Sequence, residues 1–274
     1  MIIITGSDGW IGTHLCSMLD TKEVDYLGFD RKTDYDILST EGQAEFEKAL
    51  ADASAVIHLA ARPRIPPSWK TPQDYIQDNI SLTEYIARKC AEHRVHLVFA
   101  SSSSVYGNGA GPLNPYSWTK KSCEDIISIY GNTLGLESTI CRIFTCYSED
   151  APGGEQGLVI GTWLAAVRKQ KPILVRGTGE QTRDFVHIDD VADALFRAAI
   201  LKPKNSIIDI GTGDTISLNQ IAEVFNTKII REPELAGYAV STQADINPAS
   251  EQLGWTPTIR ILNWINSVLN KNSN

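Results

Sequence analysis

A tyrosine and a lysine stand four residues apart, at Tyr116 and Lys120, downstream of a run of serines at 101–104. Residues four apart share one helix face, so the lysine ammonium could stabilise a phenolate at Tyr116. A phenolate accepts a proton from an alcohol, and a serine hydroxyl can hold the alcohol oxygen and relay that proton. Because an ordinary tyrosine has a pKa of about 10, this chemistry also needs a positively charged cofactor nearby.

A glycine-rich segment near the start of the chain could hold a dinucleotide. It follows an apolar run and opens a helical pattern, which is the context that such a motif requires. The first glycine permits a tight turn, the second lets the backbone approach a pyrophosphate, and the third packs the helix against the strand. The spacing is one residue wider than the usual fingerprint, so alone it could be a simple turn. The predicted cofactor contacts here are Gly6, Gly9, Trp10, Ile11 and Gly12.

Asp30 strengthens the cofactor prediction. It ends the second apolar run, 18 positions after Gly12. A carboxylate at this place accepts hydrogen bonds from an adenosine ribose and repels a 2′-phosphate, which favours NAD over NADP. Arg31, directly beside it, makes this preference a moderate one.

Apolar runs alternate with helical patterns along the chain. This alternation predicts an α/β fold, a Rossmann-type doubly wound parallel sheet covered by helices on both faces. The predicted strands are 1–5, 24–29, 54–59, 95–100, 137–143 and 206–210. The predicted helices are 10–20, 40–51, 72–93, 115–134, 155–170, 189–201 and 217–226, with a proline-rich loop at 63–67.

We expect two units. Residues 1–146 would form an NAD-binding domain to which the chain returns at about 184–213, and residues 147–274 a small, partly interleaved substrate-binding lobe.

Composition excludes several classes of protein. The 274 residues carry a net charge of −8, which argues against a nucleic-acid binder. Five scattered cysteines without a C-x-x-C pair or His-rich spacing predict reduced thiols, a cytoplasmic location and no metal site. Met1 runs directly into an apolar strand, so we expect no signal peptide, and no apolar run is long enough to span a membrane.

Taken in order, the motifs resemble the extended short-chain dehydrogenase/reductase superfamily, in its NAD-dependent nucleotide-sugar epimerase/dehydratase branch. The resemblance covers almost the whole chain. The matching segments are Gly6 to Gly12, Asp30, Asp36-Ile37, His58 to Ala61, Asn79, Ser101 to Gly107, Asn114 to Lys120, Arg142-Ile-Phe, Gly177 to Asp190, Ile210 to Gly213 and Leu253 to Pro257.

The resemblance implies a role for individual residues. Ser102 matches the catalytic serine, Tyr116 the base, and Lys120 the residue that binds the nicotinamide ribose. Further cofactor contacts would come from Asp36 and Ile37 at the adenine, from Ala60 and Ala61 at the pyrophosphate and ribose, and from Asn79. The substrate contacts would be Ser102, Ser103, Thr145 and, at the nucleotide diphosphate, Arg183.

The resemblance also favours one reaction. Dehydratases of the branch need an acid and a base directly after the catalytic serine, where this chain has Ser103 and Ser104. The leading hypothesis is therefore an NAD-dependent nucleotide-sugar 4-epimerase, acting on a UDP-sugar through a transient 4-keto intermediate. The alternatives are an NAD(P)H-dependent reductase of a keto-sugar or other carbonyl and, with little weight, a non-catalytic dinucleotide sensor.

Three departures leave the sugar open. Thr145 replaces the family's asparagine, the loop between Tyr106 and Tyr116 is short, and no arginine precedes Gly237. The resemblance further implies a homodimer built on the helices at 72–93 and 115–134.

Overall fold

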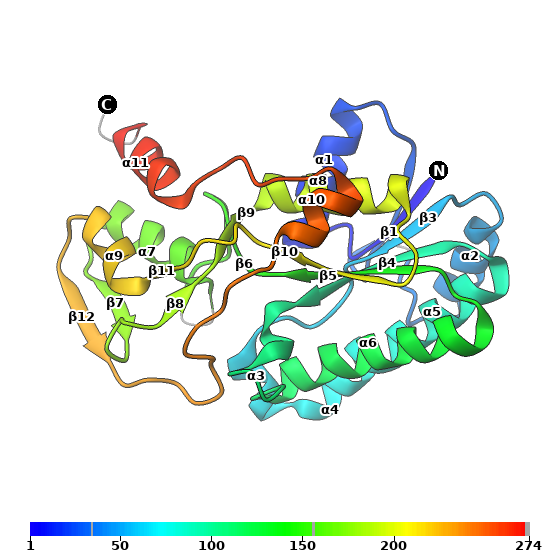
Figure 1. Ribbon diagram of the computed structural model, residues 1–274, viewed down its shortest axis with the longest axis horizontal. Helices are drawn as coiled ribbons and strands as arrows, with labels where there is room; N and C mark the ends of the chain where they lie inside the picture. The colour runs from blue at the N-terminus through cyan, green and yellow to red at the C-terminus, as the bar shows by residue number, and fades with distance from the viewer. Residues whose placement is uncertain (34, 155–156, 272–274) are drawn as a thin grey trace.

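A six-stranded parallel sheet forms the centre of the computed structural model, which describes residues 1–33, 35–154 and 157–271 (Figure 1). The strands follow the order β2-β1-β3-β4-β5-β10, and every neighbouring pair is parallel. Their bounds are β1 Ile2–Thr5, β2 Tyr26–Phe29, β3 Ala55–His58, β4 His96–Ser102, β5 Ser138–Ile143 and β10 Ser206–Ile210. Each overlaps one predicted strand, and the Rossmann-type doubly wound sheet is confirmed.

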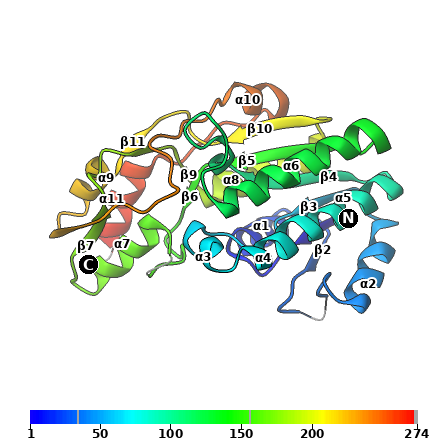
Figure 2. The ribbon, with the colours of Figure 1, turned by 90° about the horizontal axis from the view of Figure 1, so that it is seen from below.

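Helices cover both faces of this sheet. On one face lie α1 (Trp10–Thr21), α8 (Ile188–Leu201) and α10 (Asn247–Leu253), above the strands in Figure 1. The other face carries α2 (Thr40–Leu50), α5 (Leu82–His93) and α6 (Pro115–Leu134). Figure 2, seen from below, shows α5 and α6 in front of the strands.

The strands are apolar on both sides because both sides are buried. Ile2 and Ile4 belong to the core beneath α1 and α8, whereas Ile3 belongs to the core beneath α2 and α5. All three are at most 2% exposed. Successive strand residues point to opposite faces, so a two-faced core produces the continuous apolar runs seen in the sequence.

The chain reverses its direction of strand addition at β1. It adds β2 on one side of β1 and then β3 on the other, and in such sheets ligands bind in the crevice outside the carboxyl ends of these strands. The backbones are close here: a Cβ at Gly6 would lie 2.7 Å from the amide nitrogen of Ala60. Gly6 also has a φ of +76°, so only glycine fits without strain.

A third apolar cluster gathers elements from the second half of the chain, at the left of Figure 1. Its fully buried members include Trp163, Ile221 and Ile265. The elements around it are β6 Thr145–Tyr147, α7 Val159–Arg168, β7 Ile173–Arg176, β8 Thr182–Arg183, β9 Phe185–His187, β11 Ile216–Ser217, α9 Leu218–Val224, β12 Ile229–Glu232 and α11 Ile261–Lys271. The α10 segment and Trp255 return to the first core, a crossing that the sequence did not suggest.

One predicted helix has the expected bounds but contains a π-helical segment, and one predicted loop was wrong. The single helix expected over 72–93 is α4 (Pro72–Tyr75), a π-helical segment η1 (Ile76–Ser81) and then α5. The loop expected at 63–67 is largely helix α3 (Ile65–Lys70), because its prolines lie in the first helical turn, where a missing N–H costs nothing.

The helix expected over 155–170 begins at Val159 in α7, and residues 155 and 156 lie outside the described part of the chain. Within the described residues, no helix has the length and apolar character needed to cross a bilayer.

Candidate active site

Helix α6 carries the tyrosine and the lysine, one turn apart. Its start is fixed by Asn114, whose side chain accepts a 2.8 Å hydrogen bond from the Ser117 amide, and by Pro115 in the first turn. Tyr116 is partly exposed, whereas Lys120 is 4% exposed. Burial raises the pKa of Tyr116, and a hydrogen bond with Ser102 partly counteracts this effect. The structure therefore brings Ser102 and Tyr116 together, as predicted.

Lys120 lies beneath the end of β4. Its ammonium donates a 2.8 Å hydrogen bond to the Ala100 carbonyl and lies 4.7 Å from the centre of the Phe99 ring. Burial lowers its pKa to about 8. The lysine is thus a desolvated cation held one helical turn from the tyrosine.

The four serines have separate roles. The Ser102 hydroxyl accepts hydrogen bonds from the Ser104 amide at 3.2 Å and from the Ser104 hydroxyl at 2.9 Å. The Ser101 hydroxyl instead donates to Glu124 at 2.6 Å. Ser103 is buried at the start of the 3₁₀ turn η2 (Ser103–Tyr106).

Glu124 is a structural residue that the sequence analysis missed. Besides Ser101, it accepts two hydrogen bonds from Arg142, at 2.9 and 2.6 Å, and it is 2% exposed. This two-pronged pair ties α6 to β5 and so fixes Tyr116 and Lys120 relative to the sheet. An acidic residue two turns beyond Tyr116 on an otherwise buried helix face was the available signal.

The glycine-rich turn leads into α1, and no side chain caps the first amides of this helix. Gly9 is the N-cap and supplies no side-chain acceptor, so the first-turn N–H groups can meet an anion. A Cβ at Gly12 would lie 2.1 Å from the Gly6 carbonyl oxygen, which explains the third glycine. This cradle fits the pyrophosphate of a dinucleotide.

Asp30 lies at the end of β2 beside this cradle. Its carboxylate accepts hydrogen bonds from the amides of Asp8, at 3.2 Å, and Lys32, at 3.0 Å. Arg31 turns away and pairs with Asp78 at 2.9 Å. Because Arg31 is engaged there, it is poorly placed to favour a 2′-phosphate.

Three other predicted cofactor contacts are placed by the fold in different ways. Asp36 is partly exposed and caps a turn by accepting from the Leu38 amide at 3.0 Å, while Ile37 is 5% exposed. The side chain of Asn79 forms hydrogen bonds within the protein. Its oxygen accepts from the Arg62 amide at 2.7 Å, and its nitrogen donates to Thr119 at 2.9 Å. Asn79 therefore positions the chain after Ala61 rather than presenting a free amide.

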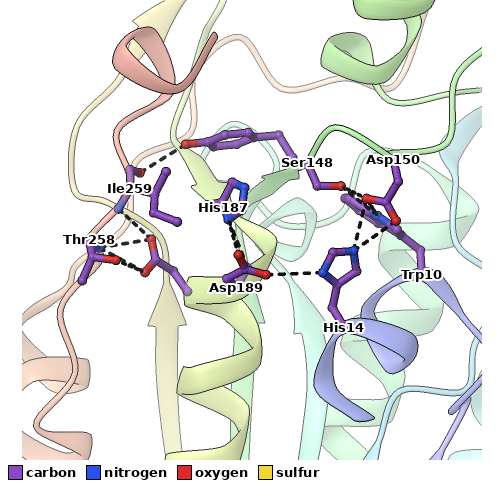
Figure 3. A network of polar contacts seen from close by, with 10 residues as sticks. Trp10, His14, Ser148, Asp150, His187, Asp189, Thr258 and Ile259 are labelled. Carbon is purple, nitrogen blue, oxygen red and sulfur yellow. Dashed lines mark hydrogen bonds and ion pairs between the residues drawn. The ribbon is translucent and has the colours of Figure 1, made fainter. Parts of the chain in front are cut away.

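Trp10 and His14 on α1 join the first core to the second half of the chain (Figure 3). The Trp10 indole donates to the Ser148 hydroxyl at 3.1 Å and to Asp150 at 3.4 Å. His14 lies 3.1 Å from Asp150 and 3.3 Å from Asp189 through its two ring nitrogens. Residues more than 130 positions apart meet here, so no local sequence pattern indicated this network.

The two remaining substrate candidates, Thr145 and Arg183, lie on strands β6 and β8 in the second half of the chain. Thr145 opens β6, and its amide donates to the Asp184 carbonyl at 3.0 Å. The Arg183 guanidinium donates to the carbonyls of Ala239 at 2.6 Å and Val240 at 3.2 Å. No carboxylate pairs with Arg183 among the described residues.

The fold and this site define a dinucleotide-binding enzyme with a tyrosine–lysine centre. The family model for the NAD dependent epimerase/dehydratase family matches residues 2–211. A Methanocaldococcus jannaschii protein with the provisional name UDP-glucose 4-epimerase is 32% identical, over 100% of this chain and 99% of the relative. The chain belongs to the NAD dependent epimerase/dehydratase family.

Two further comparisons agree. A UDP-glucuronate 4-epimerase from Thermodesulfobacterium geofontis is 35% identical over 76% of this chain and 69% of that protein. The solved structure of MoeE5 in complex with UDP-glucuronic acid and NAD has a TM-score of 0.87 and 27% identity, covering 100% of this chain and 99% of that one.

Proposed function

We propose that this protein is an NAD-dependent UDP-sugar 4-epimerase. The observation that carries the proposal is the grouping of Ser102, Tyr116 and Lys120 at the carboxyl end of β4, in the same parallel sheet whose strand β1 leads into the glycine-rich turn. Relatives that match 76% to 100% of this chain are named as UDP-sugar 4-epimerases, which supports the same reaction.

The residues divide the proton chemistry between them. Tyr116, as a phenolate, accepts the proton of the sugar C4 hydroxyl, while Ser102 holds that oxygen by a hydrogen bond. Lys120 contributes positive charge one turn away, which favours the phenolate. NAD, held by the glycine-rich turn and Asp30, would supply the hydride acceptor for C4 and the hydride donor for the opposite face of the 4-keto sugar. Tyr116 then gives back its proton, so neither protein nor cofactor changes overall.

The cofactor pocket combines several elements. The first turn of α1 would hold the pyrophosphate, with Trp10 and Ile11 beside it, and Asp30 would hold the adenosine ribose. Ile37 and the backbone at Asp36 would line the adenine, Ala60 and Ala61 the diphosphate and ribose, and Asn79 would act through the chain that it positions.

Epimerisation is favoured over dehydration by the groups next to Ser102. Ser103 and Ser104 have no carboxylate, and Glu124, which the serine run does contact, is engaged by Arg142. No acid–base pair therefore follows the catalytic serine to remove water from the keto sugar.

Arg183 is the proposed diphosphate ligand of the substrate, with Ser103 and Thr145 lining the sugar. The guanidinium of Arg183 has no carboxylate partner, and burial lowers its pKa. A bound anion would stabilise its charged form, which favours anion binding here.

A homodimer and a cytoplasmic location complete the proposal. Trp118 and Ile129 on the outer face of α6 are 50% and 56% exposed, and Ile76 on η1 is 40% exposed. Their apolar side chains suit the helix pairing that we propose for the dimer. All five cysteines are unpaired, which suits a reducing compartment. Light scattering should report a dimer that Trp118→Glu with Ile129→Glu dissociates.

The test of the activity has two steps. Denaturing the purified protein should release NAD, since an epimerase retains its cofactor. UDP-glucose and UDP-glucuronate, followed by NMR, should then convert to their C4 epimers without net change in NADH. Stoichiometric NAD(P)H oxidation would identify a reductase instead, and no conversion of any UDP- or dTDP-sugar would reject catalysis of this type.

A further inference from the structure

Arg64 is a partly buried arginine that lacks an acidic partner. Its guanidinium takes part in no ion pair or hydrogen bond with any residue that the structure describes. Two positions earlier, Arg62 pairs with Asp78 at 2.5 Å and Asp74 at 3.7 Å. Burial of a cation without a partner costs free energy, and binding of an anionic ligand would offset that cost.

The backbone at Arg64 is held in an unusual conformation. Its φ is +90°, a region that residues other than glycine rarely adopt, and it forms the N-cap of α3. The Tyr75 hydroxyl donates to the carbonyls of Pro63, at 2.8 Å, and Arg64, at 2.9 Å. These contacts hold the strained turn in place and so fix the side on which the Arg64 side chain leaves the chain.

Through Tyr75, this turn lies beside the catalytic tyrosine. The ring of Tyr75 contacts the ring of Tyr116 edge to face, with centroids 6.4 Å apart. The positive charge of Arg64 lowers the pKa of Tyr116, although burial raises it overall. Tyr238 lies near three arginines, Arg176, Arg183 and Arg64, of which Arg176 is paired with Glu232. Two arginines without carboxylate partners, Arg64 and Arg183, therefore both lie near Tyr238, and Arg64 also lies near Tyr116.

Two cations imply two anionic groups on the ligand. The diphosphate satisfies Arg183 under the function proposed above, and a neutral sugar would leave Arg64 without a partner. During epimerisation C4 lies at Tyr116, and a carboxylate at C6 is attached to C5, the neighbour of C4. A C6 carboxylate is therefore the anion that comes closest to a cation facing Tyr116.

Resting on the 4-epimerase function, we propose that Arg64 binds the C6 carboxylate of the sugar and that the substrate is a UDP-uronic acid. Arg64 is then a specificity-determining residue. A role confined to stabilising the Tyr116 phenolate would affect uronic and neutral sugars alike, because both present the same C4 hydroxyl. The two roles are thus separable by substrate.

The experiment compares UDP-glucuronate with UDP-glucose in wild type, Arg64→Gln and Arg64→Lys. Lys70→Gln removes an exposed charge at the end of the same helix and is the matched control. Wild type should prefer the uronate, and Arg64→Gln should lower the ratio of the two kcat/KM values roughly 10- to 100-fold, as for loss of a charged hydrogen bond. Arg64→Lys should recover part of the ratio, and Lys70→Gln should leave it unchanged.

Calorimetric binding of both nucleotides to the same NAD-loaded variants separates the two proposals. Tighter uronate binding that depends on Arg64 supports this inference even if no epimer forms, an outcome that would reject only the 4-epimerase function. Epimerisation of UDP-glucose with no preference for the uronate, or an equal loss for both sugars in Arg64→Gln, overturns the role of Arg64 and leaves the 4-epimerase function standing.

Discussion

The ammonium of Lys120 and the carbonyl oxygen of Ala100 lie 2.8 Å apart, at the carboxyl end of β4. This hydrogen bond and the Phe99 ring hold the lysine in a buried place that lowers its pKa to about 8. The lysine is therefore positioned before any ligand arrives, at a cost in desolvation.

That cost predicts a trade between stability and activity. Lys120→Met should abolish epimerisation yet raise the melting temperature of the cofactor-free protein. Lowering the pKa from 10.5 to about 8 corresponds to on the order of 3 kcal/mol. Loss of the Ala100 hydrogen bond offsets part of this, so we expect a net gain of about 1 kcal/mol, or roughly 2–4 °C.

The gain should depend on pH. The unfolded lysine titrates near 10.5 and the folded one near 8, so wild type gains stability as pH rises between these values. The advantage of Lys120→Met should therefore be largest below pH 8 and shrink above it. A variant less stable than wild type at pH 7 would contradict this account.

Removing the Tyr116 hydroxyl should stop the reaction without disturbing the fold. Tyr116→Phe keeps the ring against Tyr75 but removes the proton acceptor, so kcat should fall roughly 10²- to 10⁴-fold. NAD content should stay that of wild type. Tyr130→Phe, on the same helix but bonded to Glu84, is the control and should remain active. Activity of Tyr116→Phe within tenfold of wild type would reject the assigned base.

Cofactor binding should lower the pKa of Tyr116. Burial raises this pKa in the protein alone, and the positive nicotinamide would favour the phenolate. The difference in ultraviolet phenolate absorbance between wild type and Tyr116→Phe, titrated with and without NAD, isolates this one tyrosine. An apparent pKa that is unchanged or higher with NAD would show that the cofactor does not face the hydroxyl.

Breaking the Glu124–Arg142 pair should destabilise the protein strongly. Arg142 is only 14% exposed, and Glu124→Gln leaves its charge unbalanced, which typically costs about 3–5 kcal/mol. Glu92→Gln breaks the surface pairs of Glu92 with Arg88 and Lys89 and should cost about 1 kcal/mol or less. Urea unfolding compares them, and equal losses would mean that the buried pair is dispensable.

Local sequence patterns predicted the regular strands and helices of the fold. The six strands of the sheet, the start of α6 at Pro115 and the placement of Ser102 beside Tyr116 follow from periodicity and motif. The two-residue strands β8 and β11 carry too little pattern to be predicted, since their pairing is set by distant contacts.

The sequence likewise could not predict which distant residues form hydrogen bonds with a buried polar group. Asp184 is fully buried and accepts hydrogen bonds from the amides of Thr212, Gly213 and Ala244, at 2.7, 2.8 and 3.2 Å. The sequence shows an aspartate beside Arg183 but not its partners, which are about 28 and 60 positions away. For the same reason, the sequence could not show that Arg64 has no acidic partner.

The π-helical segment η1 has a consequence for the evolution and engineering of this chain. Its wider turn lets the neighbours Asp78 and Asn79 both be buried, at 5% and 1% exposure, where they hold Arg31 and the chain after Ala61. Deleting one residue from η1 would restore a regular helix and turn α4 by about 100° relative to α5. Both anchors would be lost in a single step, so the length of this segment is constrained more tightly than its composition.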